Sequence, residues 1–385
     1  MKVDDVQAAV KEAQGPLWVK GGGTKPGLAG GEGAAALDLA GLSGVLAYDP
    51  AEFTFTALAG TPLRDVEAAL AEHRQYLPFD PPLAARGATL GGTLAAGLSG
   101  PGRYRFGGVR DFILGVRYVD GAGEVVRGGG QVVKNAAGFD IPKLMVGSLG
   151  RYGALVELTF KVFPRPAHAV TVRVPWPTLA EAAAAMARVY DAPLDVDALD
   201  LWPAGDGWAL MVRLAGPAAA LPARVERIRP VAGGETDVLA GEADAEAWRA
   251  MREMEWVPAG WGLVKVALSP AKVEPLAGLL ETAARAIPGR GEALAPGDIA
   301  NAELARQVLR PCFSVGGNVA WIATPEPPAL GPALSELGLP GLVVLGPAGA
   351  PLIGAHTGSA FERRVKSALD PVGRFAGHAP AIQPA

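Results

Sequence analysis

Over the first 165 residues, the pattern of hydrophobic and polar positions predicts short strands that alternate with amphipathic helices. Strands are expected at 16–19, 36–39, 45–50, 53–60 and 153–164, and a hairpin over 112–129 turns at Asp120-Gly121. One helix is expected at 3–14. A second runs from Leu63 to about His73, with Thr61 as its N-cap and a proline as its first residue. This part of the chain has the pattern of a mixed α+β domain.

The pattern changes after Pro166, where helices and strands begin to alternate at wider spacing. Strands are expected at 171–176, 197–203, 208–214, 262–270, 318–324 and 341–346, and helices at 178–190, 244–254 and 273–287. Such an order predicts one antiparallel sheet with helices on one side. A last short helix is expected at 361–371. Four tryptophans of this region, Trp202, Trp208, Trp256 and Trp261, suit either an exposed interface or the core.

Composition excludes several classes of protein. The net charge of −4 and the pI of about 5.7 argue against nucleic-acid binding. Cys312 is the only cysteine, so the chain can build no disulfide or iron–sulfur cluster by itself, which fits a cytoplasmic location. No apolar run reaches about 18 residues, so no transmembrane segment is expected. The four histidines, His73, His168, His356 and His378, have no metal-binding spacing.

Three turns rich in small residues are the candidate chemistry of the chain: 19–27, 86–102 and 146–157. Main-chain N–H groups in such turns can surround the phosphates of a dinucleotide, because absent side chains allow close approach. A helix that begins near Gly91-Gly92 would add a favourable partial charge. Neither a Rossmann fingerprint nor a GxxxxGK[ST] loop is present. Taken singly, each turn could equally be an ordinary flexible turn or a place of close packing.

Together these segments resemble a known family. VKGGGTK (19–25), ATLGGTLAAGLSGP (88–101) and GSLGRYGALVELTFKVFP (147–164) are similar to the FAD-binding domain of vanillyl-alcohol oxidase and p-cresol methylhydroxylase, the PCMH type. Within that family, 103–148 and 365–375 are most similar to the E subunit of bacterial glycolate oxidase. The resemblance implies an α+β fold: a two-subdomain PCMH-type FAD-binding domain (1–166), a smaller α+β cap with an antiparallel sheet (167–345), and a segment (346–385) that returns to the first domain.

The resemblance also implies which residues contact FAD. The first turn should hold the pyrophosphate, the second should lie along the pyrophosphate, ribityl chain and ring, and the third should flank the adenine. The expected contacts are Gly21, Gly22, Gly23, Thr24, Lys25, Thr89, Gly91, Gly92, Gly97, Ser99, Gly100, Lys134, Asn135, Gly150, Gly153, Leu155 and Val156. Leu155 and Val156 could instead be strand core, and Lys134 a surface residue. Gly138, Phe139 and Asp140 should approach the ring, although Asp140 could simply cap the next helix. The first turn has no His or Cys, so non-covalent FAD is expected.

The resemblance implies an electron-transferring or structural FAD subunit of a glycolate oxidase complex. Its partners would be a catalytic flavoprotein D subunit and an iron–sulfur F subunit, through which the complex could attach to the inner membrane. A self-sufficient flavin-dependent 2-hydroxy acid dehydrogenase is one alternative, with Arg103, Arg105, Arg110, Arg310 and Arg374 as candidates for holding a carboxylate. The other alternative is a non-enzymatic scaffold that has lost FAD. No catalytic residue is assigned.

Overall fold

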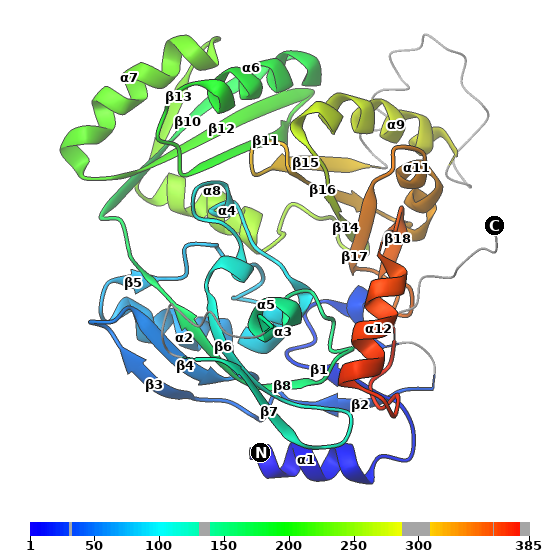
Figure 1. Ribbon diagram of the computed structural model, residues 1–385. Coiled ribbons are helices and arrows are strands. Elements are labelled where there is room, and N and C mark those ends of the chain that lie inside the picture. Colours follow the sequence, from blue (N-terminus) through cyan, green and yellow to red (C-terminus); the bar gives the residue numbers. More distant parts are fainter. Residues whose placement is uncertain (31–32, 131–138, 287–308, 357, 378–385) are drawn as a thin grey trace. The chain divides into compact units, whose positions relative to one another are not determined.

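The computed structural model describes residues 1–385 except 31–32, 131–138, 287–308, 357 and 378–385. It divides into two compact units (Figure 1). Unit 1 combines Met1–Arg165 with Thr357–Ala385, and unit 2 is Pro166–His356. The chain therefore leaves unit 1, builds unit 2 and comes back to unit 1 for its last helix.

Unit 1 contains two main layers of strands. β1 (Leu17–Lys20) pairs in parallel with β2 (Ala35–Asp38), and a separate five-stranded antiparallel sheet has the order β3-β4-β8-β6-β7. The strands of that sheet are β3 (Val45–Asp49), β4 (Thr54–Leu58), β6 (Ile113–Val119), β7 (Val125–Gly129) and β8 (Ala154–Lys161), and β5 (Gln75–Tyr76) pairs with β9 (Phe163–Pro164). The hairpin predicted at Asp120-Gly121 is confirmed as the β6–β7 pair.

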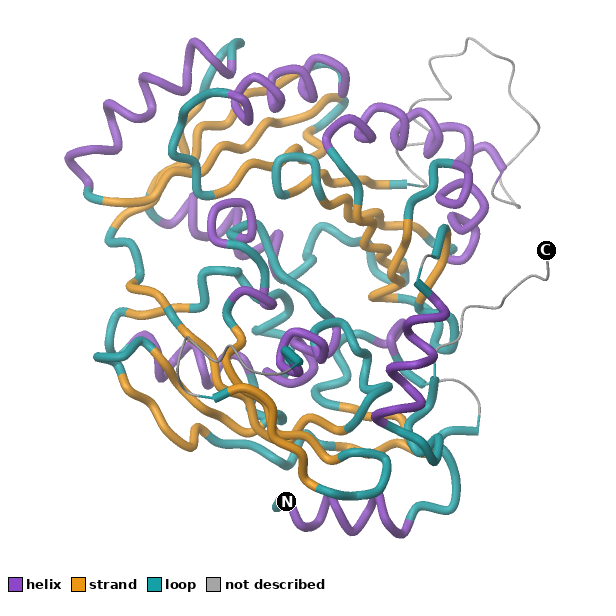
Figure 2. The backbone as a smooth tube through the Cα atoms, viewed as in Figure 1, coloured by secondary structure: helices purple, strands orange, loops and turns teal. Residues whose placement is uncertain are grey.

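The helices of unit 1 are short, and long loops join them (Figure 2). They are α1 (Val3–Glu12), α2 (Leu63–Ala71), α3 (Leu90–Ala96), α4 (Arg103–Phe106), α5 (Ile141–Met145) and α12 (Ser359–Leu369), with 3-10 turns η1 (Pro26–Leu28) and η2 (Val109–Asp111). The helix predicted to start after Thr61 begins at Leu63, but Thr61 is not its cap. The Thr61 hydroxyl instead donates to the Leu58 carbonyl at 2.7 Å and accepts from the Gly44 N–H at 2.9 Å, so it closes the loop before the helix.

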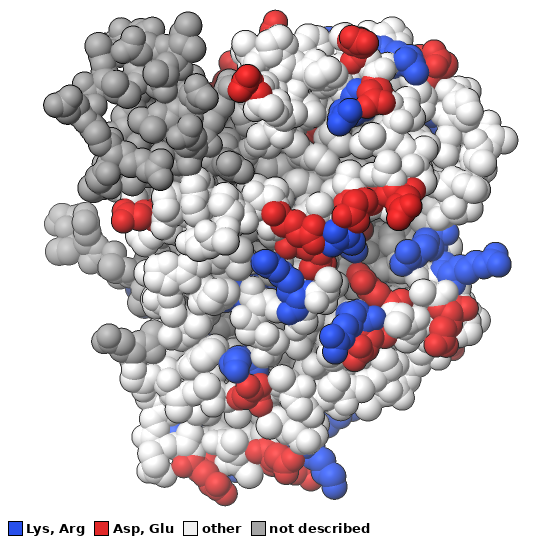
Figure 3. Space-filling model, turned by 180° about the vertical axis from the view of Figure 1, so that it is seen from behind, with Lys and Arg blue, Asp and Glu red and all other residues white. Residues whose placement is uncertain are grey.

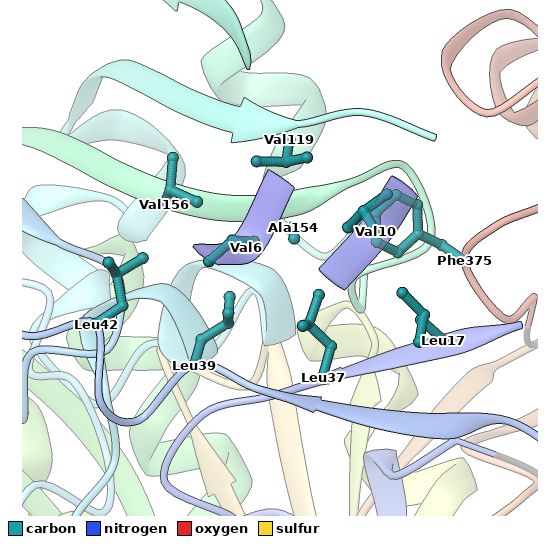
Figure 4. Packing of buried hydrophobic residues seen from close by; sticks show 10 residues of the cluster. All are labelled: Val6, Val10, Leu17, Leu37, Leu39, Leu42, Val119, Ala154, Val156 and Phe375. Carbon is teal, nitrogen blue, oxygen red and sulfur yellow. The ribbon is translucent and has the colours of Figure 1, made fainter. Parts of the chain in front are cut away.

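One hydrophobic cluster joins the two layers of unit 1 (Figure 4). Val6 and Val10 from α1 are fully buried between the apolar residues of the β1–β2 pair and those of the five-stranded sheet. The other members are Leu17, Leu37, Leu39, Leu42, Val119, Ala154, Val156 and Phe375. Phe375 comes from the C-terminal segment, so the end of the chain completes the core around its first strand.

Unit 2 is built on a nine-stranded sheet in which every pair is antiparallel, in the order β13-β10-β12-β11-β15-β16-β14-β17-β18. Its strands are β10 (His168–Trp176), β11 (Ala198–Ala204), β12 (Gly207–Gly216), β13 (Asp237–Ala240), β14 (Gly262–Ala267), β15 (Arg310–Ser314), β16 (Val319–Thr324), β17 (Pro340–Leu345) and β18 (Leu352–Gly354). The helices are α6 (Leu179–Asp191), α7 (Leu221–Ala232), α8 (Glu242–Arg252), α9 (Val273–Ala286) and α11 (Gly331–Glu336), with 3-10 turns η3 (Ala218–Ala220), η4 (Pro270–Lys272) and η5 (Pro327–Leu330). The antiparallel sheet agrees with the sequence prediction.

The prediction that helices cover one side of this sheet is wrong. α6 and α7 lie on one face, and α8 packs on the other (Figure 1), where Trp248 contacts Ala209 and Met211 of β12. Consecutive residues 209–212 are all buried, so this strand is covered on both faces. It therefore does not show the alternation of buried and exposed residues that a half-exposed strand has. The four tryptophans singled out above are all half-buried rather than exposed. Trp202, for example, packs edge-on against Trp248 with ring centroids 4.8 Å apart.

A buried polar network fastens α8 to the sheet of unit 2. The Asp244 carboxylate, 2% exposed, accepts hydrogen bonds from the Thr171 hydroxyl at 2.6 Å and the Arg213 guanidinium at 2.7 Å. The indole N–H of Trp248 donates to the same Thr171 hydroxyl at 2.8 Å. A buried carboxylate with such partners stabilises the fold mainly because removing it leaves the other groups unpaired.

We expect Asp244→Ala to lower the free energy of unfolding of unit 2 by about 2–4 kcal/mol, since it leaves a guanidinium and a hydroxyl without their acceptor. Asp237→Ala is the matched control, because it removes an exposed pair with Arg173 from the same sheet and should cost less than about 1 kcal/mol. Urea unfolding followed by tryptophan fluorescence measures both. Equal losses of unfolding free energy in the two variants would contradict the role of Asp244 in fastening α8 to the sheet.

Candidate functional site

The three glycine turns predicted from the sequence meet in one cleft of unit 1. The cleft encloses about 760 Å³, including the space open to solvent. Among the expected contact residues, those that line it are Gly21, Gly22, Gly23, Thr24, Lys25, Thr89, Gly91, Gly92, Gly150, Gly153 and Leu155. Segments 19–25 and 88–92, which are well separated in sequence, therefore line the same cleft.

The loop that follows β1 offers unpaired main-chain donors to this cleft. In the described part of the chain, no protein acceptor binds any of the N–H groups of Gly21, Gly22, Gly23, Thr24 and Lys25. Gly22 and Gly23 are exposed, and Gly23 has a φ of +67°, which favours glycine. Such a run of free N–H groups around a turn is a site for an anion.

Close packing explains why the first two positions of this loop are glycines. A Cβ on Gly21 would lie 2.3 Å from the Thr89 hydroxyl oxygen, and one on Gly22 would lie 1.9 Å from the Gly87 carbonyl oxygen. Both distances are far inside van der Waals contact. The loop is thus pressed against the turn before α3, which fixes the direction of its free N–H groups.

The N-terminus of α3 does not provide the anion site that the sequence suggested. Its first N–H groups already have protein acceptors: Leu90 donates to Thr61, Gly91 to Ala59, Gly92 to the Thr89 hydroxyl, and Thr93 to the Thr89 carbonyl. Gly91 is a packing glycine, since a Cβ there would lie 2.7 Å from that of Ala59. The helix forms a wall of the cleft, and the free donors belong to the β1 loop.

The third turn closes the opposite wall of the cleft. Leu149 and Gly150 both have positive φ values, +53° and +75°, and a Cβ on Gly150 would approach Val19 of β1 at 3.1 Å. From Gly153 the chain enters β8, where Leu155 faces the cleft. The neighbouring Val156 faces the hydrophobic cluster of Figure 4, as the period of a strand requires.

Lys25 supplies positive charge to the cleft. Its ammonium group donates to the Thr24 hydroxyl at 3.2 Å, and burial lowers the pKa of Lys25 to about 8. Within the described residues no carboxylate pairs with it. A half-buried ammonium group beside free N–H groups favours a ligand with negative charge.

Several expected contact residues do not line the cleft. Gly97 ends α3 in the left-handed conformation, the Ser99 hydroxyl accepts from the Val109 N–H at 2.9 Å, and Gly100 packs on Asp80. Val156 is fully buried core, which was the alternative interpretation. Lys134, Asn135 and Gly138 lie outside the described residues. Asp140 caps α5 by accepting from the Lys143 N–H, and Phe139 is exposed. The side chains of Arg103, Arg105 and Arg110 are exposed and away from the cleft.

Sequence reasoning did not assign ten further residues that line the cleft, some of them inside the three turns and some next to them. They are Trp18, Val19, Lys20, Leu28, Ala29, Leu39, Ala59, Ala95, Ala96 and Leu149. Most are apolar or small, and only their position next to a glycine turn could have identified them. On the face shown in Figure 3, acidic and basic side chains are interspersed, so charge on that face gives no comparable signal.

Comparison with known proteins agrees with this geometry. Residues 1–129 match the family model FAD_binding_4, "FAD binding domain", so FAD is the cofactor of unit 1. The chain is 38% identical over 253 residues to "Glycolate oxidase subunit GlcE" of Escherichia coli, covering 66% of this chain and 68% of that protein. The chain belongs to the GlcE family.

The chain is also similar to proteins with other names. This chain is 35% identical over 182 residues to "D-2-hydroxyglutarate dehydrogenase" of Xanthomonas citri pv. viticola, covering 45% of this chain but 38% of that protein. The solved structure of "alkyldihydroxyacetonephosphate synthase in P212121" has the same fold with a TM-score of 0.69 at 16% identity, covering 99% of this chain and 74% of that one. Among the described residues, no helix is both long and apolar enough to cross a membrane, and no group of His, Cys, Asp and Glu could hold a metal ion.

We expect Gly22→Ala to weaken FAD binding at least about tenfold, because its Cβ would collide with the Gly87 carbonyl and push the loop away from the turn before α3. Gly15→Ala is the control, since nothing lies within 4 Å of the added Cβ. Titration of the purified apoprotein with FAD, followed by flavin fluorescence, measures the dissociation constants. Unchanged affinity in Gly22→Ala would contradict this site.

Proposed function

We propose that this chain is the FAD-holding subunit of a glycolate oxidase complex, with an electron-transferring or structural role beside a catalytic flavoprotein subunit. The observation that carries the proposal is the β1 loop, in which five consecutive N–H groups are free at the floor of a cleft. One curated relative, matched over 68% of its length, is named as one subunit of a glycolate oxidase. A protein named "Glycolate oxidase subunit GlcD", from Bacillus subtilis, is 28% identical over 169 residues.

The residues of the cleft fit FAD. The N–H groups of Gly21 to Lys25 and the Lys25 ammonium group would hold the pyrophosphate, and Leu39 and Leu155 would supply apolar contacts. Gly150 and Gly153 would flank the adenine end. FAD supplies the capacity to accept two electrons, which no side chain provides. The protein's part is to bind the cofactor, orient it and exclude water from it.

The chemistry of this site supports non-covalent FAD. The loop after β1 offers Thr24 and Lys25 where an attachment site would need His or Cys. Cys312 is completely buried in unit 2, and burial raises the pKa of its thiol well above the usual range. His73 is exposed and packs edge-on against Tyr48. We further propose a complex in the cytoplasm that reaches the inner membrane only through its partners.

The partners that we propose are a catalytic flavoprotein D subunit and an iron–sulfur F subunit. A self-sufficient 2-hydroxy acid dehydrogenase is the second candidate, favoured by the 35% identity to a D-2-hydroxyglutarate dehydrogenase. The two candidates differ in whether this chain alone reduces its flavin with substrate.

We expect FAD affinity to fall as the pH rises from 7 to 9. The pKa of Lys25 is about 8 in the free cleft, and a bound pyrophosphate raises it by favouring the charged form. FAD binding then takes up a proton above pH 8, so the dissociation constant increases by up to about tenfold per pH unit. Lys25→Met should bind FAD more weakly at pH 7 and lose this dependence. Lys20→Met is the control, because the Lys20 ammonium is paired with Asp38, and this variant should keep the pH dependence. If the FAD dissociation constant of the wild type does not change between pH 7 and 9, Lys25 does not contact the pyrophosphate.

We expect the purified chain, loaded with FAD, to show no bleaching of its flavin absorbance at catalytic rates when glycolate or D-lactate is added. The same substrates should bleach flavin in the complex obtained by co-expression with the D and F subunits. Copurification through a tag on this chain, with flavin counted per subunit, tests the partners. Rapid bleaching by this chain alone would favour the self-sufficient dehydrogenase.

A further inference from the structure

The C-terminal helix of unit 1 presents three charged residues toward the cleft walls. Glu362, Lys366 and Asp370 follow one another at intervals of four, so they project from the same side of α12 and its end. Two of them contact Arg151, the residue after Gly150: its guanidinium pairs with Glu362, and its carbonyl accepts from the Lys366 ammonium at 2.7 Å.

The Lys366 ammonium is saturated by acceptors of unit 1. Besides the Arg151 carbonyl it donates to the Phe375 carbonyl at 2.6 Å and to the Asp370 carboxylate at 2.5 Å, which uses its three donors. The Asp370 side chain is fully buried and also accepts from the N–H groups of Arg374 and Phe375, both at 2.8 Å. Lys366 and Asp370 therefore fix the conformation of 374–376.

The segment 374–376 in turn fixes β1. The Leu17 N–H donates to the Arg374 carbonyl, and the Ala376 N–H donates to the Leu17 carbonyl, both at 2.7 Å. β1 thus has β2 on one edge and the C-terminal segment on the other. Four residues beyond Leu17 the chain reaches Gly21 and the free N–H groups.

One ammonium group accordingly links both walls of the cleft. On one side it holds the main chain of Arg151, next to the Gly150 turn. On the other it holds Phe375, which is paired with the strand that carries the glycine loop. Gly150 and Val19 are the points at which the two walls meet.

We propose that Lys366, with Asp370, is a positioning residue for FAD: it sets the separation of the β1 loop and the Gly150 turn without touching the cofactor. This inference rests on the proposed placement of the FAD pyrophosphate at the β1 loop. Lys366 contributes through geometry, so its loss reduces FAD affinity beyond any loss of fold stability.

The experiment compares Lys366→Met with the double variant Lys366→Met/Asp370→Asn. Lys366→Met leaves the Asp370 carboxylate buried without its cation and should lower both stability and FAD affinity. The double variant removes that unpaired charge, so its melting temperature should return toward that of the wild type. Its dissociation constant for FAD should remain at least about tenfold higher than that of the wild type, because the Arg151 and Phe375 carbonyls still lack their shared hydrogen-bond donor.

Arg117→Met is the matched control, since it breaks another half-buried ion pair of unit 1, with Glu157, away from β1 and the Gly150 turn. It should bind FAD within about twofold of the wild type. Recovery of both stability and affinity in the double variant overturns the inference. The inference is also overturned if the double variant binds FAD normally while Gly22→Ala does not. That result would leave the proposed function intact. Normal binding in both variants overturns the placement of FAD as well.

Discussion

A diphosphate can be held by main-chain N–H groups only where the fold leaves those groups unpaired and still rigid. Most structure does the opposite, because helices, sheets and caps consume their own donors. Unit 1 resolves this conflict at the end of β1. The loop from Gly21 to Lys25 makes no main-chain hydrogen bond through its N–H groups to the described protein, yet Gly21 and Gly22 are pressed against the turn from Gly87 to Thr89. Rigidity comes from packing, so hydrogen-bonding capacity remains for the ligand.

Glycine serves two different purposes in this site, and sequence alone does not separate them. Gly21, Gly22 and Gly91 all sit in turns of small residues. The first two let a loop with free donors approach its neighbour, whereas Gly91 lets a helix approach Ala59 while its own N–H is already paired. The positions of the turns were therefore predictable from sequence. Which turn offers donors depends on hydrogen bonds between distant segments, which no local pattern contains.

The same limit applies to the fold. The longer strands, the β6–β7 hairpin and the antiparallel sheet of unit 2 follow from local periodicity, and the resemblance identified the family. β13, β15, β18 and helix α7 were not predicted. Thr61 was misassigned as a cap because a loop closed by Gly44 competes for its hydroxyl. α8 was placed on the wrong face because the strand beneath it is apolar on both sides. Leu155 and Val156, adjacent in sequence, were both assigned to the cofactor, but strand geometry sends only one of them toward the cleft.

The return of the C-terminal segment to β1 has a consequence for biosynthesis. The glycine loop precedes unit 2 in the chain, and the segment that pairs with the other edge of its strand follows unit 2. All of unit 2 is translated between them. The nascent chain must therefore carry β1 with one edge and part of its apolar core uncovered until residues 374–376 have been synthesised. A completed cleft is accordingly available to flavin only after residues 374–376 have been synthesised.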